Sequence, residues 1–182
     1  EATAADLKWL ADPAEEPEPF GDGGTKMAWN TFNVVSIYPN GNPVMSDVNQ
    51  RWVGDCCACA VIASMAYLYP RFVKHIIKDN MDKTYTVTMY DPKGKQISVG
   101  VGGDYFIGNS GDLGALGGRN KEVTWATILE KAMIKWNQIY QGSSNVGGIG
   151  TEYVSAIFTG DGESVGFGAN ALIAEDLQRA VE

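Results

Sequence analysis

The sequence predicts a mixed α+β fold that is mainly helical, with one central buried helix and one β-hairpin. Small and apolar residues follow Asp55 and stop at Pro70, the pattern of a helix that is buried on every side. Two alternating segments flank the turn at residues 91–94, so a hairpin is expected. Apolar residues recur at helical spacing from Thr124 to about Tyr140, which predicts a second long helix.

Length and charge narrow the class of protein. The chain has 182 residues, and its 14 Lys and Arg against 22 Asp and Glu give a net charge of −8. This length fits one domain with a real core. The acidic balance and the absence of Lys and Arg clusters argue against nucleic acid and against anionic membrane surfaces as partners. No membrane span is expected, because the longest apolar run, Cys56–Tyr69, is shorter than the roughly 20 residues required.

The chain divides at about residue 24. Residues 1–24 are rich in Asp, Glu and Pro and predict an acidic linker or a propeptide remnant rather than packed core, with a short helical turn around Leu7 to Leu10. Residues 25–182 form the folded domain. Its first part, Lys26–Pro43, is irregular and ends in a turn at Pro39–Pro43.

Turn residues and caps set the other boundaries. Strands are predicted at Tyr85–Tyr90 and Lys95–Val101, and Thr124 and Gly142 bound the second long helix. Residues 100–119 contain eight glycines and predict a long loop. The glycines fit neither a dinucleotide fingerprint nor a P-loop.

The two ends suggest a processed chain. It begins at Glu1 without Met, and a last helix capped by Asn170 runs into the chain end, so the polypeptide is expected to continue elsewhere. A processed start and an acidic leader favour a secreted or cell-envelope location. The free cysteines favour the cytoplasm as the alternative.

Three cysteines, Cys56, Cys57 and Cys59, are the distinctive chemical feature. They are too close in sequence to staple the fold, and with His75 as the one histidine they do not form the spaced pairs of a zinc site. Cys56 follows Asp55 in the first turn of the predicted helix, where the backbone dipole favours a thiolate. The alternative is that all three fill space in a tightly packed helix.

The residues around Cys56 resemble a known family. Asp47–Cys56 contains a glutamine six residues before a Gly-Asp-Cys, and it resembles the active-site segment of calpain-type cysteine peptidases of the papain-like group. Further blocks match in order and spacing: Trp125–Ala132, Gly147-Gly148, Thr151-Glu152 and Phe158-Thr159-Gly160. The resemblance implies the mainly helical first lobe of a papain-like peptidase.

The same resemblance implies roles for five residues. Cys56 would be the nucleophile that attacks a peptide carbonyl, and Gln50 with the Cys56 N–H would bind the oxyanion. Gly147 and Gly148 would be the backbone edge along which a protein or peptide substrate lies. Asp47 falls where calpains place a calcium-binding carboxylate.

Three departures from the family qualify these roles. Cys57 stands where the family usually has Trp. The family also has an acidic calcium ligand two residues before the Trp that matches Trp125, and this sequence has no acidic residue there. Calcium is therefore not expected to be required, and Asp47 is expected to be solvated. The catalytic His and Asn would come from a second lobe, because His75 lies in the wrong part of the chain.

The sequence therefore predicts a thiol endopeptidase whose first lobe needs a second-lobe polypeptide as partner and needs no other cofactor. The cut between lobes would be autoprocessing or another cleavage, and the first lobe of an uncut enzyme is an alternative with the same chemistry. A non-catalytic interaction module derived from such a lobe is the other alternative. The joint presence of Gln50, Gly54, Asp55 and Cys56 favours the enzyme, since packing alone does not require that set.

Overall fold

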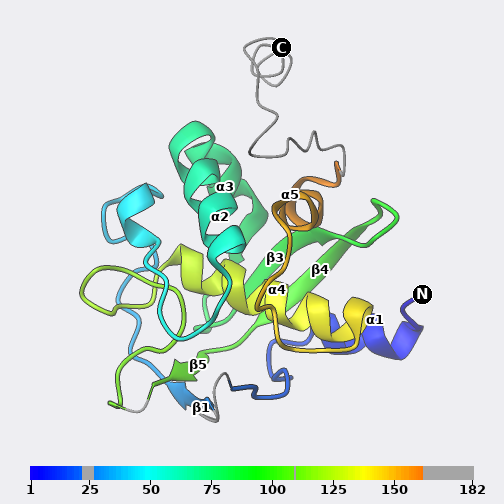
Figure 1. The fold of residues 1–182 in the computed structure, drawn as a ribbon, viewed down its shortest axis with the longest axis horizontal. Coiled ribbons are helices and arrows are strands. Elements are labelled where there is room, and N and C mark those ends of the chain that lie inside the picture. Colours follow the sequence, from blue (N-terminus) through cyan, green and yellow to red (C-terminus); the bar gives the residue numbers. More distant parts are fainter. Residues whose placement is uncertain (22–26, 109, 162–182) are drawn as a thin grey trace, which may run out of the picture.

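The computed structural model describes residues 1–21, 27–108 and 110–161 and shows a mixed α+β fold (Figure 1). Its elements in chain order are α1 (Ala4–Ala11), β1 (Ala28–Thr31), the short 3-10 helix η1 (Met45–Asp47), α2 (Cys56–Leu68), α3 (Pro70–Ile76), β2 (Ile77–Asp79), β3 (Tyr85–Tyr90), β4 (Gln96–Val101), β5 (Asp104–Ile107), α4 (Trp125–Gln141) and α5 (Thr151–Thr159).

Helix α4 forms the centre of the molecule. Every residue from Trp125 to Asn137 is buried, and the helix contacts α1, α2, β3 and β4 (Figure 1). Thr124 caps its start by accepting the N–H of Ala126, and Gly142 ends it in the left-handed conformation at φ 73°. The predicted boundaries of this helix are confirmed.

The prediction that the helix after Asp55 is the central, fully buried one is wrong. Helix α2 starts and stops where expected, but only one face is covered, and the buried residues are Ala58, Ile62, Met65 and Ala66. Ala60, Ser64, Tyr67 and Leu68 are exposed. A uniformly apolar composition does not say how many sides of a helix its neighbours cover, and here α3, α4, α5 and η1 leave one side open.

The predicted hairpin is confirmed. Strands β3 and β4 pair antiparallel from Tyr85 opposite Val101 to Tyr90 opposite Gln96. The side chain of Asp91 accepts the N–H groups of Lys93 and Lys95, each at 2.9 Å, and so closes the turn. Strand β2 adds a third strand beside β3, and this strand and helix α3 before it were not predicted.

A second, two-stranded sheet joins segments that the sequence predicted as irregular chain and as loop. Strand β1 pairs antiparallel with β5, with Trp29 opposite Phe106, and the two rings stack with centroids 3.9 Å apart. The loop prediction for residues 100–119 is therefore wrong at Asp104–Ile107. Neither strand has a partner nearby in sequence, so no local turn signal marks the pair.

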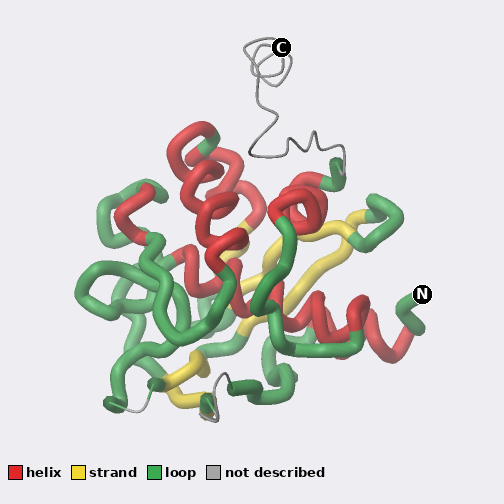
Figure 2. The backbone as a smooth tube through the Cα atoms, in the orientation of Figure 1, coloured by secondary structure: helices red, strands yellow, loops and turns green. Residues whose placement is uncertain are grey.

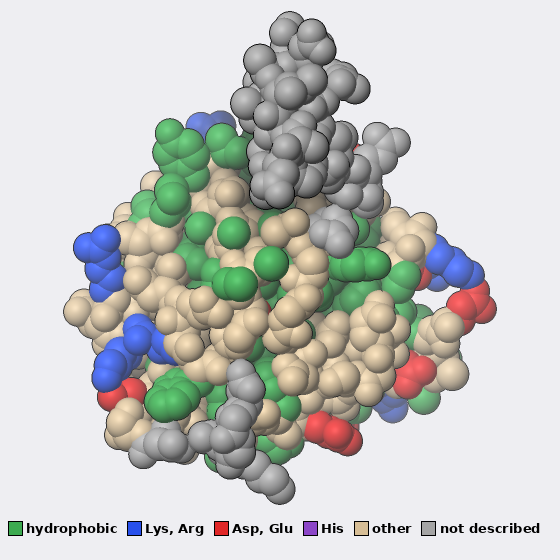
Figure 3. Space-filling view, in the orientation of Figure 1, with side chains coloured by type: hydrophobic (Ala, Val, Ile, Leu, Met, Phe, Trp, Pro, Cys, Tyr) green, Lys and Arg blue, Asp and Glu red, His purple; other side chains and the backbone are tan. Residues whose placement is uncertain are grey.

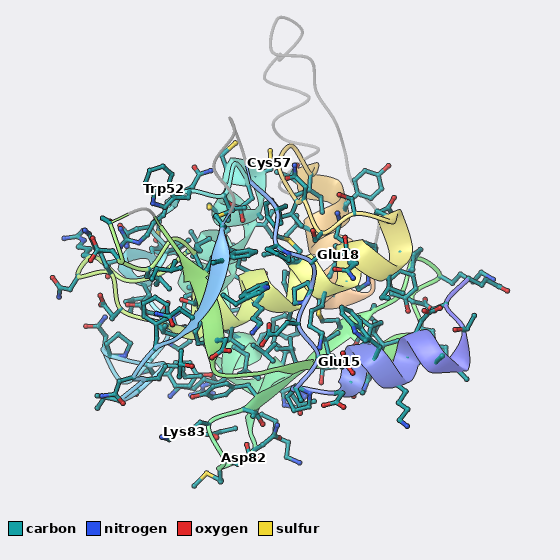
Figure 4. The ribbon with its side chains drawn as sticks, turned by 90° about the horizontal axis from the view of Figure 1, so that it is seen from below. Glu15, Glu18, Trp52, Cys57, Asp82 and Lys83 are labelled. Carbon is teal, nitrogen blue, oxygen red and sulfur yellow. The ribbon has the colours of Figure 1, made fainter. Side chains whose placement is uncertain are left out.

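The helical turn predicted around Leu7 to Leu10 is confirmed, but the prediction that residues 1–24 hold no packed core is wrong for the described part, residues 1–21. Helix α1 begins with a capping box between Thr3 and Asp6, and Leu10 is completely buried. The chain after α1, which we call the acidic strap (residues 12–20), lies against α4 (Figure 2). Glu15 and Glu18 of the strap, labelled in Figure 4, are exposed.

Two buried lysines of α4 hold the acidic strap in place. Lys131 Nζ lies 2.6 Å from a carboxylate oxygen of Glu16, and Lys135 Nζ donates to the backbone carbonyls of Asp12 and Gly100 at 2.8 Å each. Burial lowers the pKa of Lys135 to about 8, because the ammonium has lost most of its water. The charge of the strap is thus compensated from inside the domain, which composition alone does not reveal.

The rest of the described chain adds one helix. Helix α5 was not predicted; it packs on α2 and β3 and ends at Gly160, where φ is 77°. The predicted helix that starts at Asn170 lies outside the described residues. Among the helices within the described ranges, none is by itself long and apolar enough to cross a membrane, and α2 with α3 reaches that length only across a bend of 112°.

Candidate active site

Cys56 is the first residue of α2, and its side chain is exposed. Asp55 occupies the N-cap position, as expected, but its side chain makes no capping hydrogen bond. The free N–H groups of a first helical turn carry partial positive charge, so an anion is stabilised beside them. Cys56 is therefore open to solvent and stands at the N-terminal end of the α2 dipole.

The chain before α2 is fastened to the glycine-rich loop. The N–H of Asn49 donates to Gly117 O at 2.9 Å, that of Trp52 donates to Gly114 O at 3.1 Å, and an Arg51 guanidinium nitrogen donates to Gly118 O. These bonds fix the position of the chain that leads into Cys56. Trp52 and Cys57 both lie at the upper edge of Figure 4, on the same side of the molecule.

Gln50 lies in this fastened segment with its side chain exposed. Its Nε2 donates to Val53 O at 2.9 Å, so in this structure the amide closes its own loop. An oxyanion role would require the amide to exchange that carbonyl for the substrate oxygen. The position of Gln50 in the loop before Cys56 is compatible with that role. In this structure, however, its amide donates to Val53 O and is not available to an oxyanion.

Gly147 and Gly148 lie beside Gly54 in space, although they are far from it in sequence. The N–H of Gly148 donates to the carbonyl of Gly54 at 3.2 Å, two residues before Cys56. Gly148 has φ 76°, and a Cβ built there would meet nothing within 4 Å. The structure therefore brings together the two separated sequence blocks that carry Cys56 and the glycine pair, and the backbone at Gly148 is open.

A groove of about 430 Å³ runs along the glycine pair. It is lined by α4 residues such as Trp136, by the following loop with Asn145, Gly147 and Gly148, and by Tyr153 of α5. Cys56 does not line this groove. The groove therefore follows the glycine pair and does not enclose the Cys56 side chain.

Asp47 is not the solvated residue that the sequence predicted. It is only 2% exposed, and its carboxylate accepts from Trp125 Nε1 at 2.7 Å, Asn40 Nδ2 at 2.9 Å and the Val44 N–H at 3.2 Å. These bonds tie the segment before α2 to the start of α4. Within the described ranges, no group of three or more His, Cys, Asp and Glu side chains is placed to hold a metal ion.

A buried carboxyl pair lies behind Cys56, and sequence reasoning missed it. Asp55 and Glu130 are each 1% exposed, and their carboxyl groups are in hydrogen-bonding contact. Glu130 also accepts the Leu116 N–H at 2.9 Å. A charged residue on the otherwise apolar face of α4 was the available signal for this pair.

Burial raises the pKa of Asp55 to about 6 and that of Glu130 well above its ordinary value, because both charges have lost their water. Two like charges in contact cannot both ionise at low cost, so the pair keeps one proton at neutral pH. The Oδ2 atom of Asp55 meets no N–H donor among the described residues, and the Glu130 proton is the donor that fits it.

The other two cysteines of the cluster are half-buried. Cys59 Sγ donates to Asp55 Oδ1 at 3.5 Å, and burial followed by the Asp55 charge raises the pKa of its thiol. Cys59 is therefore a protonated thiol at neutral pH. The one histidine of the chain, His75, is exposed in the last turn of α3, and α3 starts at the end of α2 that is remote from Cys56.

Comparisons with known proteins add no relative: no family model matches the chain, and no curated protein matches it.

Proposed function

We propose that this chain is the first lobe of a two-lobe, calpain-type thiol endopeptidase of the papain-like group, with Cys56 as its nucleophile. One observation carries the proposal: the exposed Cys56 begins α2, and the distant Gly148 is hydrogen-bonded to Gly54 beside it. A nucleophile and an open backbone edge side by side are what cleavage of an extended peptide requires.

In the proposed reaction the Cys56 thiolate adds to the scissile carbonyl, and negative charge moves to the carbonyl oxygen. The Cys56 N–H belongs to the free first turn of α2 and donates to that oxygen. The Gln50 amide joins it after leaving Val53 O, to which it donates at 2.9 Å in this structure. Such donors typically contribute about 3 kcal/mol each to lowering the barrier.

The chain lacks a base for this chemistry. A thiol peptidase of this type uses an imidazole to form the ion pair and to protonate the leaving amine. His75 is directed to solvent on α3, so we assign the base and its orienting Asn to a second-lobe polypeptide. Asp47, bonded to three nitrogen donors, serves as a structural link in this proposal and not as a calcium ligand.

The first test is chemical. The full chain is treated with less than one equivalent of iodoacetamide at pH 6.5, and the modified cysteine is located by mass spectrometry. Cys56 should react well ahead of Cys57 and Cys59, and Cys56→Ala should remove the fast phase while Cys57→Ala keeps it. Equal reaction of the three thiols would contradict the assignment of the nucleophile.

The second test concerns the division of labour. The chain alone should not hydrolyse peptides, and the coding frame beyond residue 182 should supply a β-rich segment with a His and, later, an Asn. Adding that polypeptide should produce hydrolysis that Cys56→Ala abolishes. Hydrolysis by the chain alone, lost in Cys56→Ala, would show that no second lobe is needed.

A non-catalytic interaction module is the second candidate, and one observation favours it. Tyr67, Leu68 and Tyr69 at the end of α2 are 73%, 59% and 63% exposed, and hydrophobic side chains gather over that end of α2 and α3 in Figure 3. Such a patch suits a protein partner. Slow alkylation of Cys56 in the complete assembly would favour this candidate over the peptidase.

A further inference from the structure

Cys56 and Cys59 lie on the same face of the first turn of α2. Residues three apart in an α-helix are separated by 300° of rotation and a rise of about 4.5 Å, which places their Cα atoms about 5 Å apart. That distance lies inside the range of about 4.4–6.8 Å that disulfides span. Cys57 points about 100° away from Cys56 and about 200° away from Cys59, so it is not a partner for either.

The environments of the two sulfurs differ: Cys56 can be reached by an oxidant, and Cys59 keeps its proton until the Asp55 carboxylate takes it during the attack. Cys56 is exposed, and Cys59 is half-buried with its thiol donating to Asp55 Oδ1 at 3.5 Å. The Asp55 side chain is only 1% exposed, and one of its carboxylate oxygens meets no N–H donor among the described residues. The neighbouring Glu130 carries the proton that the two carboxyl groups share. A buried carboxylate in contact with the inner thiol can take its proton.

We propose that Cys56 and Cys59 form a reversible disulfide on reaction with hydrogen peroxide, with Cys59 as the resolving thiol and Asp55 as the base that deprotonates it. Formation of the disulfide does not depend on the proposed function. Only its consequence, a reversibly inactivated site, rests on the proposed role of Cys56 as the nucleophile.

The reaction balances in two steps. First, the Cys56 thiolate attacks one peroxide oxygen, the O–O bond breaks, and the leaving hydroxide takes a proton to become water, which leaves Cys56 as a sulfenic acid. Second, Cys59 passes its proton to Asp55 and attacks the Cys56 sulfur, the S–O bond breaks, and hydroxide leaves and is protonated to water. Two thiols thereby supply the two electrons that reduce one peroxide to two waters, and a dithiol reductant reverses the change.

Geometry also favours closure at this place in the helix. Cys56 is the first residue of α2, so its N–H has no intrahelical partner and the residue can rotate without breaking a helical hydrogen bond of its own amide. Without the resolving thiol, the sulfenic acid would proceed to irreversible sulfinic acid. The disulfide is thus the form that preserves Cys56 under oxidant.

The test uses the full chain and one equivalent of hydrogen peroxide. Free thiols are blocked with iodoacetamide, the disulfide is reduced, and the released thiols are labelled with N-ethylmaleimide. The maleimide should appear on Cys56 and Cys59 and the iodoacetamide on Cys57. Cys57→Ser should leave the maleimide on Cys56 and Cys59. Cys59→Ser should stop at the Cys56 sulfenic acid, which dimedone traps, and a second equivalent of hydrogen peroxide should convert it to sulfinic acid in place of the disulfide.

The role of Asp55 is tested by Asp55→Asn, with circular dichroism to establish that the variant folds and Glu130→Gln as the matched change at the neighbouring carboxyl. Trapping of the sulfenic acid with dimedone should proceed at the wild-type rate, while disulfide closure should slow at least tenfold. Maleimide on Cys57, or closure in Asp55→Asn at the wild-type rate, would overturn the inference. The labelling pattern is measured without a peptidase assay. A chain without peptidase activity could still form the disulfide, and an active peptidase could still fail to form it, so the two proposals are tested separately.

Discussion

The proton held by the buried carboxyl pair predicts a specific dependence of stability on pH. At neutral pH the folded chain keeps a proton on Glu130, because its pKa is raised by burial and by the neighbouring Asp55. In the unfolded chain the same carboxyl has its ordinary value of 4.5 and is ionised. Unfolding therefore releases one proton, and raising the pH favours the unfolded state.

The sign and size of this effect follow from the proton count. The stability from a raised carboxyl pKa is fully present below the unfolded pKa and is lost as pH rises toward the folded pKa. One proton released on unfolding lowers the free energy of unfolding by about 1.4 kcal/mol for each pH unit. Between pH 6.5 and 7.5 Asp55, with its pKa raised to about 6, is mostly ionised in the folded chain, so the dependence on pH there comes mainly from Glu130.

Glu130→Gln is the perturbation that tests this count. Glutamine has the shape of the protonated acid, accepts the Leu116 N–H through its carbonyl and donates an amide proton to Asp55. Urea unfolding at pH 6.5, 7.0 and 7.5 should show the variant gaining stability relative to the wild type as pH rises, by up to about 1.4 kcal/mol per pH unit, which is the limit for one proton. Glu130→Ala, the control, should show the same slope with a constant loss of about 3 kcal/mol, because Leu116 N–H loses its acceptor and a cavity opens.

Parallel stability profiles for the wild type and Glu130→Gln would refute the reasoning. They would mean that Glu130 is ionised in the folded chain and that Asp55 does not share a proton with it. The carboxyl pair would then be unable to supply the Glu130 proton that balances the buried Oδ2 of Asp55.

Three further predictions concern the contacts that hold the site and the acidic strap. Asp47→Ala should cost about 3 kcal/mol in urea unfolding because the Trp125 N–H loses its buried acceptor, and calcium should leave the wild-type midpoint unchanged; a rise in midpoint with calcium would restore a metal role for Asp47. Burial lowers the pKa of Lys135 from 10.5 to about 8, so above pH 8 the folded chain binds fewer protons there than the unfolded chain does. Between pH 8 and 10.5 the free energy of unfolding of the wild type should therefore rise by up to about 3 kcal/mol relative to that of Lys135→Met. A difference between the two proteins that does not change with pH would show that the ammonium is solvated. Gly100→Ala would place a Cβ 2.4 Å from Ala11 O, so it should lower the free energy of unfolding by about 2 kcal/mol and expose the strap to proteolysis. In the matched variant Gly103→Ala the nearest atom to the new Cβ is 3.7 Å away, and little effect is expected. Equal melting temperatures for the two variants would contradict the packing of the strap.

Local signals explain which parts of the candidate site could be predicted. The start of α2 at Cys56 followed from Asp55 and the apolar run, whereas the roles of Gln50 and the glycine pair are implied by the resemblance alone. The contact of Gly148 with Gly54 joins residues that are far apart in sequence, so no local signal predicts it and only the resemblance suggested it. Asp55 was predicted as a cap and instead contacts Glu130 and Cys59, because its carboxylate is directed into the core and not toward the first turn of α2.

The sequence by itself determined the elements whose information is local. The hairpin of β3 and β4 and the helix α4 follow from alternation, helical spacing and the residues that cap and turn the chain, all of which act within a few positions. Only the tertiary structure decided which helix is central, that β1 pairs with β5, and that the acidic strap is folded onto Lys131 and Lys135. In each of these the stabilising partner is distant in sequence, so the energy that selects the conformation exists only after the chain has closed on itself.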